Sequence, residues 1–160
     1  MKTGSKIGAL FVNEQCQGVM FLYRRGVQTN MTDIKLTLSK DTKKRAPDIH
    51  SEARRLKKEG SLYYELHTKP LRASSGDWVY FIRNGEVVAR AKASKFLWMR
   101  KNDLGTTYTG EVADHDGWRV EIKPPMQIAS RLIAHSSFQG FRYVRPEEKA
   151  ALESAFAKQK

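Results

Sequence analysis

Aromatic and cationic side chains gather between residues 76 and 101 of this sequence. Trp78 and Tyr80 share one face of a predicted strand, and Arg90 and Lys92 share a face of the strand that follows. Aromatic rings can stack on nucleic-acid bases, and cations can contact phosphates. Two neighbouring strands with such side chains are more typical of nucleic-acid binding than of catalysis.

The cations that could contact phosphate form two groups. One lies in and after the aromatic stretch, and the other lies in a basic segment at about residues 40–60. Phosphate contacts give affinity and salt dependence without sequence selectivity. The second group is equally compatible with a solvated surface segment. The candidate phosphate-binding residues are Arg83, Arg90, Lys92, Lys95, Arg100 and Lys101 in the first group, and Lys43, Lys44, Arg45, Arg54 and Arg55 in the second.

The charge of the chain favours a polyanionic partner. Of its 160 residues, 29 are Lys or Arg and 17 are Asp or Glu, so the net charge is +12. Such a field attracts polyanions, of which nucleic acid is the commonest. A membrane is the rival partner, but the sequence contains no long basic amphipathic helix and no apolar stretch of about 20 residues. We therefore expect DNA or RNA as the partner, and no membrane.

Groups that could carry catalysis are sparse. The four histidines stand far apart, without the spacing of metal ligands. Asp114, His115 and Asp116 precede a glycine and predict a polar turn. Cys16 has no motif around it, which favours a small buried residue over a nucleophile. We expect no metal and no cofactor, and a binding protein rather than an enzyme, whose site would have to be assembled from distant residues.

The single cysteine also bears on the compartment. Cys16 cannot form an internal disulfide, which is typical of reducing, cytosolic surroundings. Polar residues from Asn13 to Gln17 interrupt the apolar run near the N-terminus, so no signal peptide fits. We expect a cytoplasmic protein, with a monomer as the default oligomeric state.

Apolar patterning predicts six or seven strands and a few short helices. Asn84-Gly85 is the strongest local signal, because both residues accept the positive φ angles of a type I′ hairpin turn. Asp48 is a predicted helix N-cap with Gly60 as the stop, and Pro146 opens a helix near the C-terminus. Helical spacing also predicts a helix over residues 126–134. Nine segments are candidates for these six or seven strands: residues 7–12, 18–23, 34–38, 61–68, 78–82, 87–93, 108–112, 118–123 and 138–144.

The order of motifs in the second half resembles a PUA-like barrel, the superfamily that includes EVE, YTH and ASCH domains. The resemblance covers about residues 76–156, and residues 144–148 (Val-Arg-Pro-Glu-Glu) are especially similar to the C-terminal end of EVE domains. Residues 10–14 are similar to the end of the first strand in EVE and YTH domains. The ASCH signature is not visible, which argues against that family's hydrolase or nuclease activities. The other motifs are Gly76-Asp77, the strands 78–82 and 87–93, and the strand 118–123 that ends at Pro124.

The resemblance implies a fold and a pocket. The fold is an α+β, PUA-like mixed β-barrel of six or seven strands with short flanking helices, formed as one domain by residues 1–160, with the basic segment as an insertion. EVE and YTH domains hold a flipped or unpaired base, often a modified one, and the implied pocket residues are Asn13, Glu14, Phe96 and Trp98. Trp98 follows the second hairpin strand, in a loop where YTH-like domains place a cage tryptophan. Core packing of Trp98 and a strand-end cap by Asn13 are the structural alternatives.

The sequence therefore predicts a nucleic-acid-binding domain that recognises a modified or flipped base in an aromatic pocket. A small nuclease or a nucleoside- or base-directed hydrolase on the same barrel is one alternative. A basic protein-interaction module is the other, because charge alone does not separate nucleic acid from an acidic protein.

Overall fold

The computed structural model describes residues 32–38, 48–103 and 115–158. The chain divides into two compact units, Met1–Met31 and Thr32–Lys160, and every described residue belongs to the second. The prediction of one domain over the whole chain stays a prediction. The predicted strands 7–12, 18–23 and 108–112, and the candidate residues Asn13, Glu14, Cys16, Lys43, Lys44 and Arg45, lie outside the described residues.

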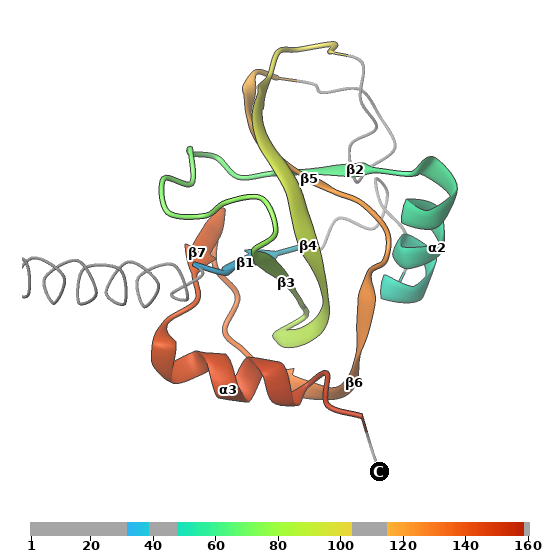
Figure 1. Ribbon diagram of the computed structural model, residues 1–160, viewed down its shortest axis with the longest axis vertical. Coiled ribbons are helices and arrows are strands. Elements are labelled where there is room, and N and C mark those ends of the chain that lie inside the picture. Colours follow the sequence, from blue (N-terminus) through green and yellow to red (C-terminus); the bar gives the residue numbers. More distant parts are fainter. Residues whose placement is uncertain (1–31, 39–47, 104–114, 159–160) are drawn as a thin grey trace, which may run out of the picture. The chain divides into compact units, whose positions relative to one another are not determined.

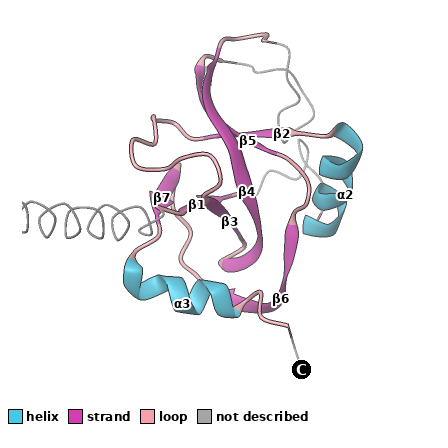
Figure 2. Ribbon diagram, in the orientation of Figure 1, coloured by secondary structure: helices cyan, strands magenta, loops and turns pink. Residues whose placement is uncertain are grey.

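The described residues form an α+β fold in which seven strands make a mixed sheet and two helices flank it (Figures 1 and 2). The sheet has the strand order β2-β5-β4-β3-β1-β7. β6 is not part of this order and pairs with β4. β1 runs parallel to β3, and the other pairings are antiparallel. Within the described residues the sheet does not close, so a barrel is not seen. The elements are β1 (Ile34–Thr37), α2 (Ile49–Glu59), β2 (Leu62–Glu65), β3 (Trp78–Arg83), β4 (Glu86–Met99), β5 (Gly117–Ile122), β6 (Gln127–Ala134), β7 (Phe141–Tyr143) and α3 (Pro146–Ser154).

The predicted hairpin and helix ends are confirmed. Asn84 and Gly85 have φ angles of 51° and 77° and join β3 to β4. Asp48 caps α2 by accepting a hydrogen bond from the Ser51 backbone at 2.7 Å, and Gly60 ends the helix with φ 82°. These features depend on a few neighbouring residues, which is why local sequence patterns predict them.

β4 is longer than the sequence pattern predicts. Its first half pairs with β3 and β6, and from Ala93 to Met99 it pairs with β5 past an irregularity between Ala93 and Lys95. The irregularity breaks the alternation of side chains, so the pattern suggests an earlier strand end. The placement of Trp98 in a loop is therefore wrong: Trp98 lies within β4, in the part that extends with β5 away from β3 (Figure 1).

The helix predicted over residues 126–134 is also wrong, because β6 occupies this segment. β6 pairs with β4 at Ala89↔Ile128 and Val87↔Ile133, with a register irregularity between the two pairs. The extra residues on β6 create apolar spacing that resembles a helix. Pairing along the open edge of β4 satisfies the backbone of both strands and overrides the local pattern.

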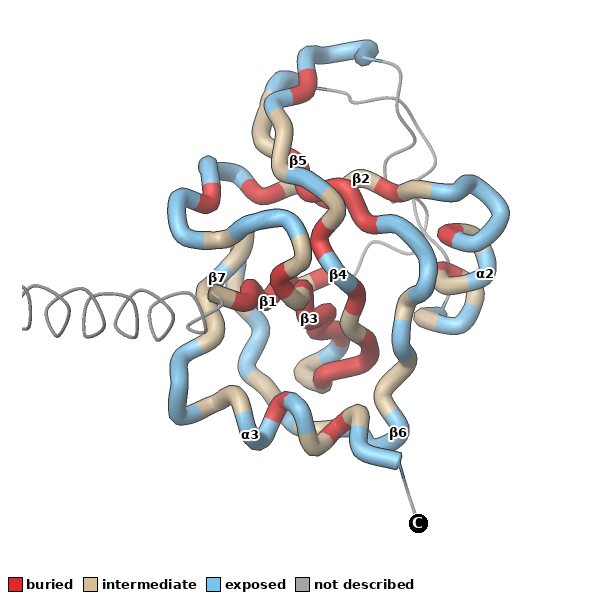
Figure 3. Tube along the Cα trace, in the orientation of Figure 1, coloured by how far each residue is buried: buried red, intermediate tan, exposed pale blue. Residues whose placement is uncertain are grey.

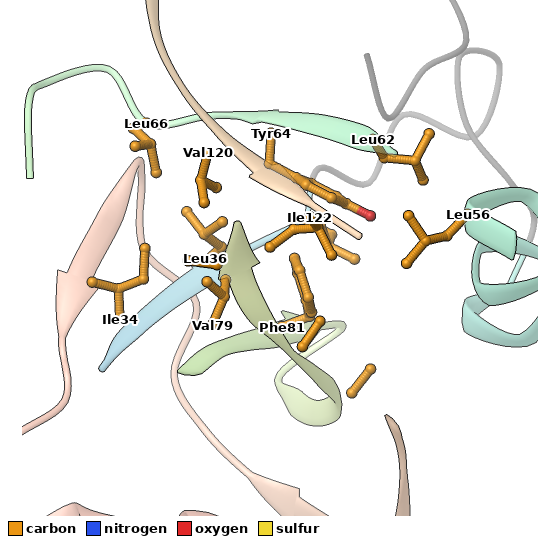
Figure 4. Packing of buried hydrophobic residues seen from close by; sticks show 14 of the residues in the cluster. Ile34, Leu36, Leu56, Leu62, Tyr64, Leu66, Val79, Phe81, Val120 and Ile122 are labelled. Carbon is orange, nitrogen blue, oxygen red and sulfur yellow. The ribbon is translucent and has the colours of Figure 1, made fainter. Parts of the chain in front are cut away.

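The main core lies on one face of the sheet and is closed by α2 (Figures 3 and 4). It packs residues of β1, β2, β3, β4 and β5 together with Leu56 of α2. The Tyr64 ring lies 4.8 Å from the Phe81 ring, and the Tyr64 hydroxyl donates to Glu52 at 2.5 Å. The largest fully buried apolar side chains of this core are Ile34, Leu56, Leu62, Tyr64, Leu66, Val79, Phe81 and Ile122.

A second, smaller core lies under α3. It contains Tyr80, Ile82, Val87 and Leu152, with Trp78 packed against it. The face of β3 that Trp78 shares with Tyr80 and Ile82 is directed to this smaller core, whereas Val79 and Phe81 face the main core. Both faces of β3 are buried because α3 covers the second one, and alternation along a strand cannot predict such a cover.

A buried ion pair joins β1 to α3. The Lys35 ammonium donates to both oxygens of Glu148, at 2.9 and 2.8 Å, and lies 3.2 Å from Nε2 of His135. Burial alone would raise the pKa of Glu148, but hydrogen bonds from Lys35 and from the Arg145 backbone and side chain outweigh it and lower the pKa to about 2. The side chain of Lys35 is only 4% exposed, so this contact ties the polar face of β1 to α3.

Candidate nucleic-acid interface

A cavity of about 490 Å³ lies where the sheet is open, at the end of β1. Its walls come from residues 64–68, at and after the end of β2, and from residues 138–141, before and at the start of β7; we call these two segments the open seam. A second hollow of about 390 Å³ shares three of its residues. Ligand pockets typically have volumes of roughly 300–1,000 Å³. The lining residues are Leu36, Thr37, Leu38, Tyr64, Glu65, His67, Phe138, Gln139 and Gly140.

The backbone of the open seam is unusual at two positions that approach each other. His67 and Gly140 both have positive φ angles, of 64° and 69°. A Cβ atom on Gly140 would lie 3.1 Å from Cδ2 of His67 and 3.6 Å from the carbonyl oxygen of Leu66, so a side chain is disfavoured there. A left-handed histidine costs roughly 1–3 kcal/mol, and such strain is concentrated at functional sites. The imidazole is thereby held at the wall that both hollows share, with its side chain 60% exposed.

A carboxylate between two imidazoles lies on the same wall. Oε1 of Glu65 is 2.7 Å from Nε2 of His115 and 3.4 Å from Nδ1 of His67. The prediction of a simple polar turn at His115 missed this contact. Glu65 and His67 are two residues apart on a predicted strand, which was the available signal, but the approach of His115 depends on the pairing of β2 with β5. Among the described residues, no group of three or more His, Cys, Asp or Glu side chains is arranged to hold a metal ion.

Two paired tryptophans, Trp118 and Trp98, lie between the open seam and the surface; we call them the aromatic row. The Leu66 amide donates to the Trp118 carbonyl at 3.0 Å, and Trp118 is paired with Trp98 across β5 and β4. Leu66 is fully buried, Trp118 is half-buried, and Trp98 is 51% exposed. The two tryptophan rings meet edge to face with centroids 5.9 Å apart, and the Lys69 ammonium lies 5.1 Å from the Trp118 centroid. Trp98 is thus two strand spacings, roughly 10 Å, from the open seam.

The other predicted pocket residues are placed differently. Phe96 is half-buried, pairs with Val120 and packs against the main core, so its ring contributes to stability rather than to an open surface. Asn13 and Glu14 lie outside the described residues. Thr37, His67 and Gln139 are cavity residues that sequence reasoning did not single out, because they come from three segments far apart in the chain.

The predicted phosphate contacts fall on several surfaces. Arg100 and Lys101 are exposed at the end of β4, and their backbone amides are held by Asp103 and Asp116, each at 2.6 Å. Lys95 is exposed and lies 3.9 Å from Glu121. On α2, Arg54 is exposed and Arg55 is half-buried.

Two cations of β4 lie against one aromatic ring. The Arg90 guanidinium is 4.1 Å and the Lys92 ammonium 3.9 Å from the Trp78 centroid, and Arg90 also donates to Gln127 at 2.8 Å. These contacts orient the two cations on the α3 side of the sheet. Arg83 is only 7% exposed, which is a poor position for a phosphate contact. Arg119 and Glu121 of β5 are also buried.

No protein-family model matches this chain, and a search of curated proteins finds no match. In the described parts of the chain, no helix is long and apolar enough to cross a membrane.

Proposed function

We propose that this chain is a PUA-like, EVE-related domain that binds DNA or RNA and holds an unpaired or flipped base at the open seam. The observation that carries the proposal is the exposed Trp98, which is paired with Trp118, the neighbour of Leu66 in the open seam. Tryptophan is usually well buried, and a half-exposed one two strand spacings from a hollow is a candidate binding surface. The residues that carry the family resemblance form β3, β4, β5, β6, β7 and α3, and β6 is a strand where the resemblance implies a helical segment.

The site offers what a base outside its stack requires. Such a base needs an aromatic face to replace its lost stacking, which is worth roughly 1–3 kcal/mol per base. It also needs a few polar groups to read its edge. Trp98 supplies an exposed ring, and Gln139 supplies an amide that both donates and accepts. The apolar side chains of Leu36, Leu38 and Phe138 can cover a methyl group on a modified base.

Cations near the same end of the sheet support the proposal. Lys69 lies over Trp118, and Arg100 and Lys101 are exposed where β4 ends, one and two residues beyond the paired Met99. A backbone that delivers a base to the cavity would pass these side chains. The net charge of +12 would add a long-range attraction that weakens with salt.

The test measures binding of oligonucleotides that carry one unpaired base, with and without a methyl group, at two salt concentrations. Trp98→Ala should weaken binding about 5- to 150-fold, the equivalent of one lost stacking contact. Leu132→Ala is the matched control, because Leu132 is similarly exposed, at 56%. Equal binding by Trp98→Ala and the wild type would refute the pocket. Failure of every nucleic acid to bind at low salt would favour the protein-interaction module instead.

One contact favours a second candidate, a nuclease or nucleoside hydrolase. A carboxylate that touches two imidazoles beside a cavity could orient them for proton transfer. Purified protein should then turn over RNA, DNA or nucleosides, and His67→Ala and His115→Ala should abolish turnover. No turnover across these substrates would exclude this candidate and leave the binding proposal intact.

A further inference from the structure

Glu65 is the one acidic residue among the described residues that line the cavity. Its side chain is 31% exposed, so the carboxylate can meet both the cavity and solvent. The two imidazoles of His67 and His115 both approach the same oxygen, Oε1. Contacts from two sides restrict the rotation of the carboxylate and fix the direction of its other oxygen.

Oε2 of Glu65 has no partner among the described residues. An ionised carboxylate has about four acceptor positions on its two oxygens. Among the described residues, Glu65 uses one of them, on Oε1, in the 2.7 Å hydrogen bond with His115, while His67 lies 3.4 Å from the same oxygen, so each oxygen keeps a position for a ligand. An acceptor that a ligand removes from water must receive a donor, because an unpaired buried polar group is costly. The free oxygen therefore selects for ligands that present N–H groups and against ligands that present carbonyl or ring-nitrogen acceptors.

The four common bases differ in this respect. Guanine presents two adjacent donors, N1–H and the N2 amino group, next to the acceptor O6. Adenine and cytosine present one amino group next to a ring-nitrogen acceptor, and uracil presents one N–H between two carbonyls. Only guanine matches a carboxylate with two parallel hydrogen bonds, and charge-assisted pairs of this kind are the strong ones.

Resting on the proposed function, we infer that the cavity is selective for guanine, with Glu65 as the residue that determines specificity. The carboxylate accepts from N1–H and the N2 amino group. The Gln139 amide, which also lines the cavity, can donate to O6. Methylation at N7 leaves both donors of guanine in place, whereas methylation at N1 removes one of them.

The first experiment uses the wild-type protein and four oligonucleotides that differ at one unpaired position: guanine, inosine, adenine or 1-methylguanine. Inosine differs from guanosine only in lacking the N2 amino group. Guanine should bind about 5- to 150-fold more tightly than adenine, with inosine between them and 1-methylguanine as weak as adenine. Equal binding of guanine and adenine overturns the inference, while the proposed function stands if Trp98→Ala still weakens both.

The second experiment compares two variants on the same oligonucleotides. Glu65→Gln keeps the size of the side chain but replaces one acceptor by a donor. The affinity for the guanine oligonucleotide should therefore fall about 5- to 150-fold, while the affinity for the adenine oligonucleotide should change less than about twofold. Trp98→Ala should weaken binding of the guanine and adenine oligonucleotides by the same factor, because stacking is tolerant of base identity. If Glu65→Gln lowers the affinity for the guanine and adenine oligonucleotides equally, the inference is overturned. If Glu65→Gln does not fold, the guanine–inosine comparison in the wild type decides alone.

Discussion

The two halves of β4 have different surroundings although they belong to one strand. Residues 86–92 lie between β3 and β6, and Ala89 and Ala91 are fully buried there. Residues 93–99 are paired with β5 and carry Trp98, which is half exposed. The same contrast separates two tryptophans: Trp78 has two cations over its ring and packs near α3, whereas Trp98 makes an edge-to-face contact with Trp118.

The comparison teaches that coverage, and not residue type, decides which aromatic side chains of this sheet are packed and which are exposed. In the first half, β3, β6 and α3 cover the strand, so its aromatic neighbours hold the fold together. In the second half, the described residues leave the outer end of the aromatic row open. Four measurements would break or sharpen this division.

The largest effect is expected from a truncation in β3, the strand that covers the first half of β4. Phe81 is fully buried in β3, paired with Ala89 of β4. Phe81→Ala should lower the free energy of unfolding by about 3–5 kcal/mol, because it removes buried area and leaves a cavity. Chemical denaturation monitored by circular dichroism measures this. A loss below about 1 kcal/mol would mean that this half is not the stable part of the sheet.

The second-largest effect is expected on the stability of the protein at acidic pH. The pKa of Glu148 is lowered from 4.5 to about 2, so its contribution to stability is fully present above about pH 4.5 and is lost as the pH falls toward 2. The shift corresponds to about 3 kcal/mol. Glu148→Gln should destabilise the protein at pH 7 and leave Lys35 without its carboxylate partner. The stability difference between wild type and variant should shrink between pH 5 and pH 2, and a constant difference would contradict the ion-pair assignment.

A smaller effect on stability is expected in the second half. Trp98→Ala should lower the free energy of unfolding by about 1 kcal/mol, because the ring loses an edge contact to Trp118 but little burial. Denaturant titration of Trp98→Ala beside Phe81→Ala measures both on one scale. If the Trp98 variant loses as much as the Phe81 variant, Trp98 is a core residue and the contrast between the halves fails.

The smallest effect is expected on the salt dependence of binding, when a cation in the first half of β4 is removed. Lys92 is exposed, and Lys92→Gln should reduce the slope of log affinity against log salt by about 1. Lys123→Gln is the control, since Lys123 is also exposed but is not a predicted phosphate contact. Trp98→Ala should weaken binding without changing the slope. An unchanged slope for the Lys92 variant would remove the α3 side of the sheet from the proposed interface.

Several parts of the fold follow from the sequence because they depend on neighbouring residues. The Asn84-Gly85 turn, the α2 caps at Asp48 and Gly60, and the start of α3 at Pro146 are all where the sequence predicts them. Local φ preferences and caps act within four residues, so they survive in any tertiary context. The +12 charge is likewise a property of the sequence, and it supports a polyanionic partner without locating the surface that binds it.

Only the tertiary structure decided which side chains are covered and which meet. Lys35 and Arg83 are buried although their residue type predicts exposure, and β6 is a strand although its spacing predicts a helix. The cavity joins residues of β1, of β2 and of the segment before β7, which lie up to about one hundred positions apart. Strand pairing and the packing of α3 create these neighbours, and such long-range contacts leave no periodic signal in the sequence.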